Sequence, residues 1–82
     1  MRLDDYLSTV GIVKRRTIAK ELASNGLVLI NDRRAKPAAQ VRVGDVIEVK
    51  GTRPSKAEVL DIPSGSVAKD RREQYYRSLA IG

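Results

Sequence analysis

The sequence contains no cysteine, histidine, tryptophan or phenylalanine, and its only aromatic residues are three tyrosines. Without cysteine, the chain has no disulfide framework and no thiolate chemistry. Without tryptophan and phenylalanine, the hydrophobic core must be built from leucine, isoleucine, valine and alanine. A chain of 82 residues buries only about 60–65% of the surface that its unfolded form exposes. We therefore expect one small domain without room for a sizeable small-molecule pocket.

Long apolar runs are also missing. No run approaches the roughly 18 residues that a membrane helix needs, and no apolar segment precedes a small-residue cleavage site as in a signal peptide. The absence of cysteine fits a reducing compartment. These features predict a cytoplasmic protein without a membrane partner.

The residue types that carry most enzyme chemistry are absent or isolated. There is no histidine or cysteine to act as a base or nucleophile, and a serine or threonine nucleophile would lack an obvious base. No phosphate-binding glycine loop, dinucleotide fingerprint or metal-ligand spacing occurs. We therefore expect no enzyme activity, no cofactor and no metal site.

Positive charge is present in excess and is unevenly placed. The net charge is +6. Residues 1–36 hold eight Lys or Arg against four Asp or Glu, residues 37–62 hold four against four, and residues 63–82 hold four against two. Seven of the basic residues lie between Lys14 and Lys36, where only two acidic residues occur. A small domain with one strongly basic side most simply binds a phosphate backbone.

Two short helices are predicted near the start of the sequence. From Leu3 to Val10, apolar residues recur at the spacing of one helical face, and Gly11 ends this helix. A second helix is expected to begin near residues 14–16 and to end at Gly26, in the left-handed conformation that glycine adopts readily. The side chains that we expect this second helix to bury are Ile18, Ala19, Leu22 and Ala23.

Three strands are predicted in the middle of the chain. Residues 27–30 form a short apolar run that leads into a turn at residues 31–32. Residues 45–50 alternate between apolar and polar positions, and a last strand is expected over residues 58–62. The side chains expected on the core face of the second and third strands are Ile47, Val49, Leu60 and Ile62.

The last segment is predicted to return to helix. Residues 63–66 have the composition of a flexible joint. After them, Tyr75 with Leu79 and Tyr76 with Ala80 form apolar pairs four residues apart, which favours a helix.

The predicted elements define the fold class as α+β. Two N-terminal helices are expected to pack on a small, mostly antiparallel sheet, and a short C-terminal helix follows. Residues 1–62 are interpreted as the binding domain and residues 63–82 as a linker with the C-terminal helix.

The basic residues of the second helix are expected to form a phosphate-binding surface. Arg16 and Lys20 are one helical turn apart, so their side chains point the same way. We expect Ile18 and Leu22 to lie on the opposing stripe and to turn these charges outward. The hairpin after the first strand would return further basic residues to the same side, namely Arg33, Arg34 and Lys36. The alternative interpretation is a solvated basic face, since spacing alone does not show that both groups converge.

An ordered set of segments runs through residues 1–50. The segments are Arg2-Leu3-Asp4, residues 15–22, residues 26–31, Lys36-Pro37 and residues 43–49. In this order they resemble the S4 RNA-binding domain (the α-L motif), a module named for the fourth protein of the small ribosomal subunit. The chain is most similar to the branch of that family that contains RqcP and the fifteen-kilodalton heat-shock protein.

The resemblance implies a function and a set of contact residues. Members of this branch bind ribosomal RNA of the large (50S) subunit and tRNA on stalled subunits that carry a nascent chain, in ribosome-associated quality control. A further quality-control factor on the ribosome is an additional implied partner. The implied RNA-binding residues are Arg2, Arg15, Arg16, Thr17, Lys20, Asn31, Arg33, Arg34 and Lys36, and the charge pattern adds Lys14.

One position departs from the family pattern. The family commonly has glycine after the asparagine of the hairpin turn, where this chain has Asp32. Aspartate tolerates the left-handed backbone that such a turn needs, so we expect the turn to form.

Three other functions remain open from the sequence. The protein could act in ribosome assembly or bind another structured RNA. It could bind DNA, because a basic second helix after a short first one is typical of a helix-turn-helix. The tail could dock a protein partner. DNA-binding dimers need an apolar dimer face, and because no spare one is evident we expect a monomer.

Overall fold

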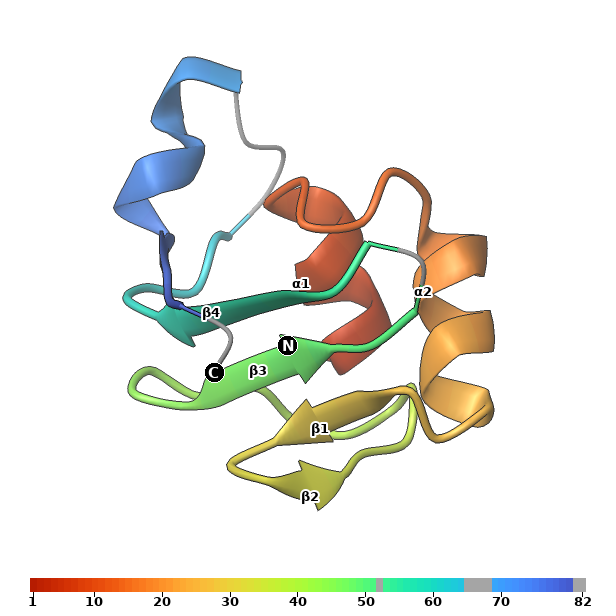
Figure 1. Cartoon of the computed structure of the whole chain (residues 1–82). Coiled ribbons are helices and arrows are strands. Elements are labelled where there is room, and N and C mark those ends of the chain that lie inside the picture. The colour runs from red at the N-terminus through yellow and green to blue at the C-terminus, as the bar shows by residue number, and fades with distance from the viewer. Residues whose placement is uncertain (52, 65–68, 81–82) are drawn as a thin grey trace.

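A computed structural model describes residues 1–51, 53–64 and 69–80 of the chain. The elements follow in the order α1 (Leu3–Thr9), α2 (Arg16–Ser24), β1 (Val28–Ile30), β2 (Arg33–Arg34), β3 (Val46–Val49), β4 (Ser55–Val59), the 3₁₀ helix η1 (Lys69–Gln74) and β5 (Tyr76–Ser78). The predicted α+β class is therefore confirmed. In Figure 1, α1 lies behind the sheet and α2 lies beside α1.

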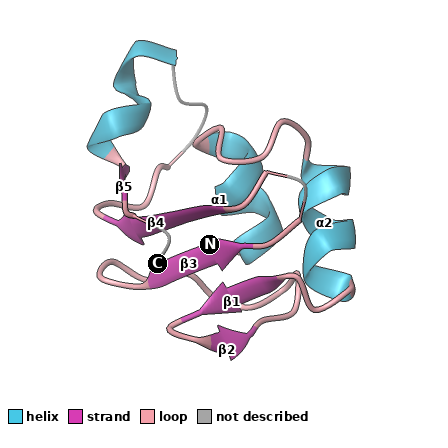
Figure 2. Ribbon diagram, in the orientation of Figure 1, coloured by secondary structure: helices cyan, strands magenta, loops and turns pink. Residues whose placement is uncertain are grey.

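The strands form one antiparallel sheet in the order β2-β1-β3-β4-β5 (Figure 2). The central strand β3 aligns Ile47 with Ile30 of β1 and with Ala57 of β4. Because side chains directly opposite one another in an antiparallel pair project to the same face, this register gathers the apolar residues on the face that the helices cover.

The core is aliphatic apart from one tyrosine. Helix α1 contributes Leu3, Tyr6 and Leu7, and the residue that caps its C-terminal end contributes Val10. All four are fully buried, and their spacing is that of one helical face. Full burial of each such side chain contributes about 1.5–3 kcal/mol. The rest of the core comes from α2, the strands and the loops, through Val13, Ala19, Ala23, Val28, Val41, Ile47, Val49, Ala57 and Val59.

Helix α2 buries a different stripe from the predicted one. Ala19 and Ala23 are buried as expected and Leu22 is half-buried, but the Ile18 side chain is 42% exposed. The prediction for Ile18 is therefore wrong. A hydrophobicity pattern gives isoleucine more weight than alanine, whereas the packed helix presents its alanines to the core, where small side chains allow a close approach to α1.

The end of α2 and the hairpin turn follow the sequence prediction. The Leu27 amide donates to the Leu22 carbonyl and the Gly26 amide to the Ala23 carbonyl, with Gly26 at a φ of +74°. This is the Schellman pattern that ends a helix. Asn31 and Asp32 have φ values of +52° and +66°, as a two-residue hairpin turn of type I′ requires.

The last third of the chain differs from the prediction. The strand expected over residues 58–62 is β4, which ends at Val59, so Ala57 and Val59 are buried while Leu60 is 41% exposed and Ile62 is half-buried. The prediction that Leu60 belongs to the core is therefore wrong. The sequence of residues 59–62 does not show which of these residues still pair with a neighbouring strand, and so the prediction placed the strand too late.

The predicted C-terminal helix is also wrong. The described tail consists of η1 and of the strand β5, in which Tyr76 pairs with Val59 of β4. A segment as short as β5 fits the apolar spacing of a helix as well as that of a strand. Pairing with the edge of β4 decides in favour of the strand. Of the predicted joint over residues 63–66, residues 65 and 66 lie outside the described residues.

Candidate nucleic-acid interface

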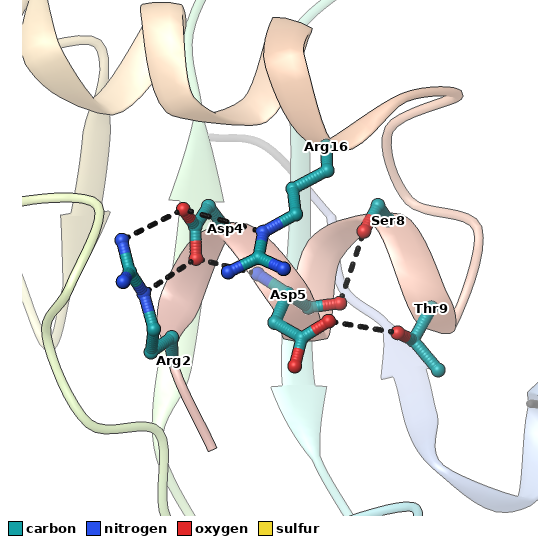
Figure 3. A network of polar contacts seen from close by, with 6 residues as sticks. All are labelled: Arg2, Asp4, Asp5, Ser8, Thr9 and Arg16. Atoms are coloured by element: carbon teal, nitrogen blue, oxygen red, sulfur yellow. Dashed lines mark hydrogen bonds and ion pairs between the residues drawn. The ribbon is translucent and has the colours of Figure 1, made fainter. Parts of the chain in front are cut away.

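The basic surface is organised around the buried carboxylate of Asp4, which is 1% exposed. Its Oδ1 accepts from Arg2 Nε at 3.2 Å and its Oδ2 accepts from Arg2 Nη2 at 3.1 Å. Arg16 Nε of α2 lies 3.7 Å from Oδ2, and all three side chains are shown in Figure 3. A buried carboxylate is costly unless it is paired, so Asp4 draws both arginines to one place.

The two arginines keep most of their surface open to solvent. The Arg2 side chain is 45% exposed and that of Arg16 is 53% exposed. Two positive charges and one negative charge leave a net positive charge at the cluster. Because a guanidinium carries five N–H donors and Asp4 uses only some of them, both arginines retain donors that can contact phosphate oxygens.

The backbone holds Arg2 in a fixed position. The chain before α1 is extended, and Arg2 forms an isolated antiparallel bridge with Gln40. The Leu3 amide donates to the Ala39 carbonyl at 2.8 Å, and the Val41 amide donates to the Met1 carbonyl at 2.9 Å. Arg2 is therefore presented from a short strand-like segment rather than from a free terminus.

The hairpin brings one arginine to the C-terminal end of α2. The Arg34 side chain lies over Gly26, where an added Cβ would be 3.5 Å from Arg34 Cδ and 3.6 Å from Arg34 Nε. The C-terminal end of a helix carries a partial negative charge, which favours a cation there. Arg34 therefore lies beside the C-terminal end of α2, and the convergence of the hairpin with Arg16 and Lys20 stays a prediction.

The other basic residues of the hairpin line a shallow groove. Arg33, Arg34 and Lys36 line the groove together with apolar residues, namely Ile30, Ala35, Ala38 and Ala39. The groove combines cations with a small apolar floor.

Two predicted residues have different surroundings. The Asn31 side chain bridges the hairpin to β3, because its Nδ2 donates to Asp45 Oδ1 at 3.1 Å and its Oδ1 accepts from the Val46 amide at 3.0 Å. Lys14 lines a second groove with Lys50 and Arg53, and not the cluster around Asp4. Asn31 thus has a structural role, and Lys14 belongs to a separate basic region.

All of the predicted contact residues are exposed. Arg2 lies before α1, and Lys14 and Arg15 lie in the loop that leads to α2. Helix α2 carries Arg16, Thr17 and Lys20. Asn31 lies in the hairpin turn, and on or just after β2 follow Arg33, Arg34 and Lys36. Their role in RNA binding stays a prediction.

Sequence reasoning missed the central role of Asp4. An acidic residue in the first turn of a helix is already favoured by the helix dipole, so its presence there does not point to a contact with arginines. The available signal was its position beside the apolar stripe of α1, between two arginines that the resemblance had already assigned to the contact surface.

The described residues contain no group of three or more His, Cys, Asp or Glu side chains placed to hold a metal ion. Over the same ranges, no helix has the length and apolar character needed to cross a membrane.

Two helices on an antiparallel sheet, with an exposed basic side, are typical of small α+β domains that bind nucleic acid. The family model described as "S4 domain" matches residues 1–47. This chain belongs to the S4 domain family.

Relatives and a solved structure agree with this assignment. The chain is 36% identical over 76 residues to the RQC P-site tRNA stabilizing factor of Streptococcus pneumoniae, which covers 92% of this chain and 86% of the relative. It is 45% identical over 67 residues to the factor of that name from Helicobacter pylori strain J99, covering 78% and 77%. The trimeric structure of Vibrio cholerae Heat Shock Protein 15 superposes with a TM-score of 0.87 at 28% identity, covering 98% of this chain and 82% of that one.

Proposed function

We propose that this protein is a bacterial RNA-binding factor of ribosome-associated quality control, which contacts ribosomal RNA of the large subunit and tRNA on stalled subunits that carry a nascent chain. The observation that carries the proposal is the cluster Arg2–Asp4–Arg16 on an S4 fold. The relatives named RQC P-site tRNA stabilizing factor support the tRNA contact.

The proposed mode of action is binding rather than catalysis. Arginines held by a buried carboxylate are ordered before RNA arrives, which lowers the entropy lost on binding. Such a surface recognises the spacing of phosphates in a folded RNA, because phosphate contacts fix position and orientation. A factor of this kind would stabilise one placement of a tRNA on the subunit, in the bacterial cytoplasm where ribosomes work.

The test compares binding to a tRNA transcript and to a duplex DNA of equal length and charge. The proposal expects the protein to bind the tRNA at least tenfold more tightly at physiological salt, with a loss of that preference in Arg16→Glu. Equal affinity for DNA and tRNA would contradict the RNA assignment and favour general polyanion binding.

We also propose that the factor acts as a monomer, because the residues of its hydrophobic core are buried by the domain's own helices, strands and loops. Sedimentation equilibrium at micromolar concentration measures the mass directly. A trimer, as in the Vibrio cholerae structure, would contradict this part of the proposal.

A further inference from the structure

A second groove lies on another side of α2 from the cluster around Asp4. Its apolar floor includes Ile12, Ile18 and Leu22, and its basic rim is formed by Lys14, Lys50 and Arg53. Its volume is about 430 Å³, within the range of about 300–1,000 Å³ typical of ligand sites. Ile18 lies two positions after Arg16, and residues at that spacing on a helix do not face each other. The groove therefore lies apart from the cluster around Asp4, although Lys14, one of the predicted RNA contacts, forms part of its rim.

The fold leaves the apolar floor open. The Ile18 side chain is 42% exposed because Ala19 occupies the buried position of α2. The backbone of Gly51 approaches the floor closely, since a Cβ at that position would lie 3.8 Å from Leu22 Cδ2. An exposed isoleucine that lines a groove together with other apolar residues and with charged residues is the pattern of an interaction site.

The charge of the rim defines the chemistry of the occupant. Among the described residues that line the groove, every charged one is a cation. A partner with negative charges around an apolar centre would satisfy both the rim and the floor. RNA would satisfy only the rim, because the groove has no aromatic side chain on which a base could stack.

We propose that this groove binds an amphipathic segment of another protein, with aliphatic residues on one face and acidic residues beside them. The segment would lie in the groove as a helix, in the manner by which helical peptides bind hydrophobic grooves. Its aliphatic residues would cover Ile18, and its carboxylates would pair with Lys50 and Arg53. This site goes beyond the proposed RNA binding and gives the factor a second, protein-directed surface.

The test uses the full chain and a synthetic peptide. The peptide carries leucines at i, i+3, i+4 and i+7, with glutamates at the flanking positions. Titration is followed by amide chemical shifts of the isotopically labelled protein. The proposal expects saturable shifts centred on residues 12–14, 18, 22 and 49–53. A scrambled peptide of the same composition, which loses the apolar face, should bind at least tenfold more weakly.

Two variants make the test specific. Ile18→Ser and Lys50→Glu each change an exposed side chain. Each should lower the affinity for the peptide by about tenfold, equivalent to 1.4 kcal/mol. Arg71→Glu, an exposed charge reversal away from the groove, should leave peptide binding unchanged. Because Ile18→Ser does not alter charge, its tRNA affinity should equal that of the unmodified protein, which separates this proposal from the RNA proposal.

Three outcomes would overturn the inference. The first is no saturable binding of the amphipathic peptide. The second is a shift pattern centred away from the groove. The third is a tRNA transcript that shifts the groove amides and loses affinity in Ile18→Ser, which would assign the groove to RNA.

Discussion

Asp4 places a buried negative charge between two arginines of the predicted contact surface. It contacts Arg2 directly and lies 3.7 Å from Arg16 Nε, and its Oδ1 also accepts from the Asp5 amide at 2.8 Å. If only net charge governed RNA binding, this carboxylate would weaken it. If the ordering of the two arginines before RNA arrives governs binding, the carboxylate strengthens RNA binding. The two explanations make opposite predictions for a neutral residue at this position.

Asp4→Asn is expected to weaken tRNA binding although it makes the surface more positive. The amide cannot hold two guanidinium groups as the carboxylate does, so both arginines would lose order. At about 0.5–1.5 kcal/mol for each side chain that must then be ordered on binding, the cost is about 1–3 kcal/mol. Fluorescence anisotropy with a labelled tRNA measures this change.

The matched control is Asp32→Asn. Asp32 is exposed in the hairpin turn, where no contact with an arginine is described, and asparagine accepts the same left-handed backbone. This variant should bind tRNA as tightly as the unmodified protein or slightly more tightly. If both variants tighten binding equally, then Asp4 acts only through its charge, contrary to the organising role.

Gly11→Ala is expected to destabilise the fold more than Gly44→Ala does. Both glycines have positive φ, at +81° and +93°, and alanine at such a φ costs about 1–2 kcal/mol. At Gly11 an added Cβ would also lie 2.4 Å from Arg72 Cζ, whereas nothing lies within 4 Å at Gly44. Urea unfolding measures both variants.

The contact with Arg72 explains the difference if the double variant Gly11→Ala with Arg72→Ala recovers part of the lost stability. Equal losses for the two glycine variants would show that the backbone alone sets the cost and that Arg72 moves aside freely.

At the scale of elements, the tail is joined to α1 by one buried hydroxyl. The Tyr6 hydroxyl donates to the Tyr75 carbonyl at 2.7 Å, and the Leu60 amide donates to that carbonyl at 2.8 Å. The strand β5 then pairs with β4. The tail thus completes the edge of the sheet, and Tyr6 connects this edge to the helical layer.

Tyr6→Phe is expected to lower the free energy of unfolding by about 0.5–1.5 kcal/mol at neutral pH. Burial raises the pKa of Tyr6, and Tyr76 and Asp61 act in the same direction. A raised pKa means that the folded state holds the proton more tightly, so this contribution is full below the unfolded pKa of about 10 and falls as the pH rises above it.

The difference in stability between the unmodified protein and Tyr6→Phe should therefore narrow or reverse above about pH 10. Other groups that titrate in this range are common to both proteins and cancel in the comparison. A difference that stays constant through alkaline pH would mean that the buried phenol does not control this dependence.

Some elements could be predicted from the spacing and type of their own residues, and others could not. The face of α1 and the end of α2 depend on helical spacing and on Gly26, and the sequence contains both. The strand β2 has only two residues, both arginines, and neither has the apolar alternation of a strand. Its pairing follows from the left-handed turn at Asn31 and Asp32, and not from the pattern of its own two residues.

The sequence predicted which residues belong to the candidate RNA-binding surface better than it predicted how their side chains are placed. The charge cluster indicated which side chains are basic and exposed, but no spacing rule showed that Asp4 would join Arg2 to Arg16. That contact depends on how α1 packs against α2. Likewise Lys14 is close in sequence to Arg16, yet it lines a different groove because the loop before α2 turns it toward Lys50.

At the scale of the whole molecule, affinity for RNA is expected to depend steeply on salt. Each phosphate contact adds about 0.7–0.9 to the slope of log K against log salt concentration. Lys20→Ala should reduce that slope by the amount that corresponds to about one phosphate contact. Arg71→Ala, on the exposed tail, should leave the slope unchanged. An equal reduction in both variants would indicate that net charge, and not the α2 surface, governs binding.

The most direct test of the central claim is sedimentation of a bacterial lysate through a sucrose gradient, with the protein and its variant Arg16→Glu/Lys20→Glu followed across the subunit fractions. Lys20 is exposed, whereas Arg16 is a partner of the buried Asp4 carboxylate, so the melting temperature of the variant is measured first and sedimentation is compared only at a temperature at which the variant is folded. We expect the protein to sediment with the large ribosomal subunit and the variant to stay at the top of the gradient. If the variant sediments with the large subunit as the unmodified protein does, or if the unmodified protein is found with the small subunit, the proposed surface or the proposed partner is wrong.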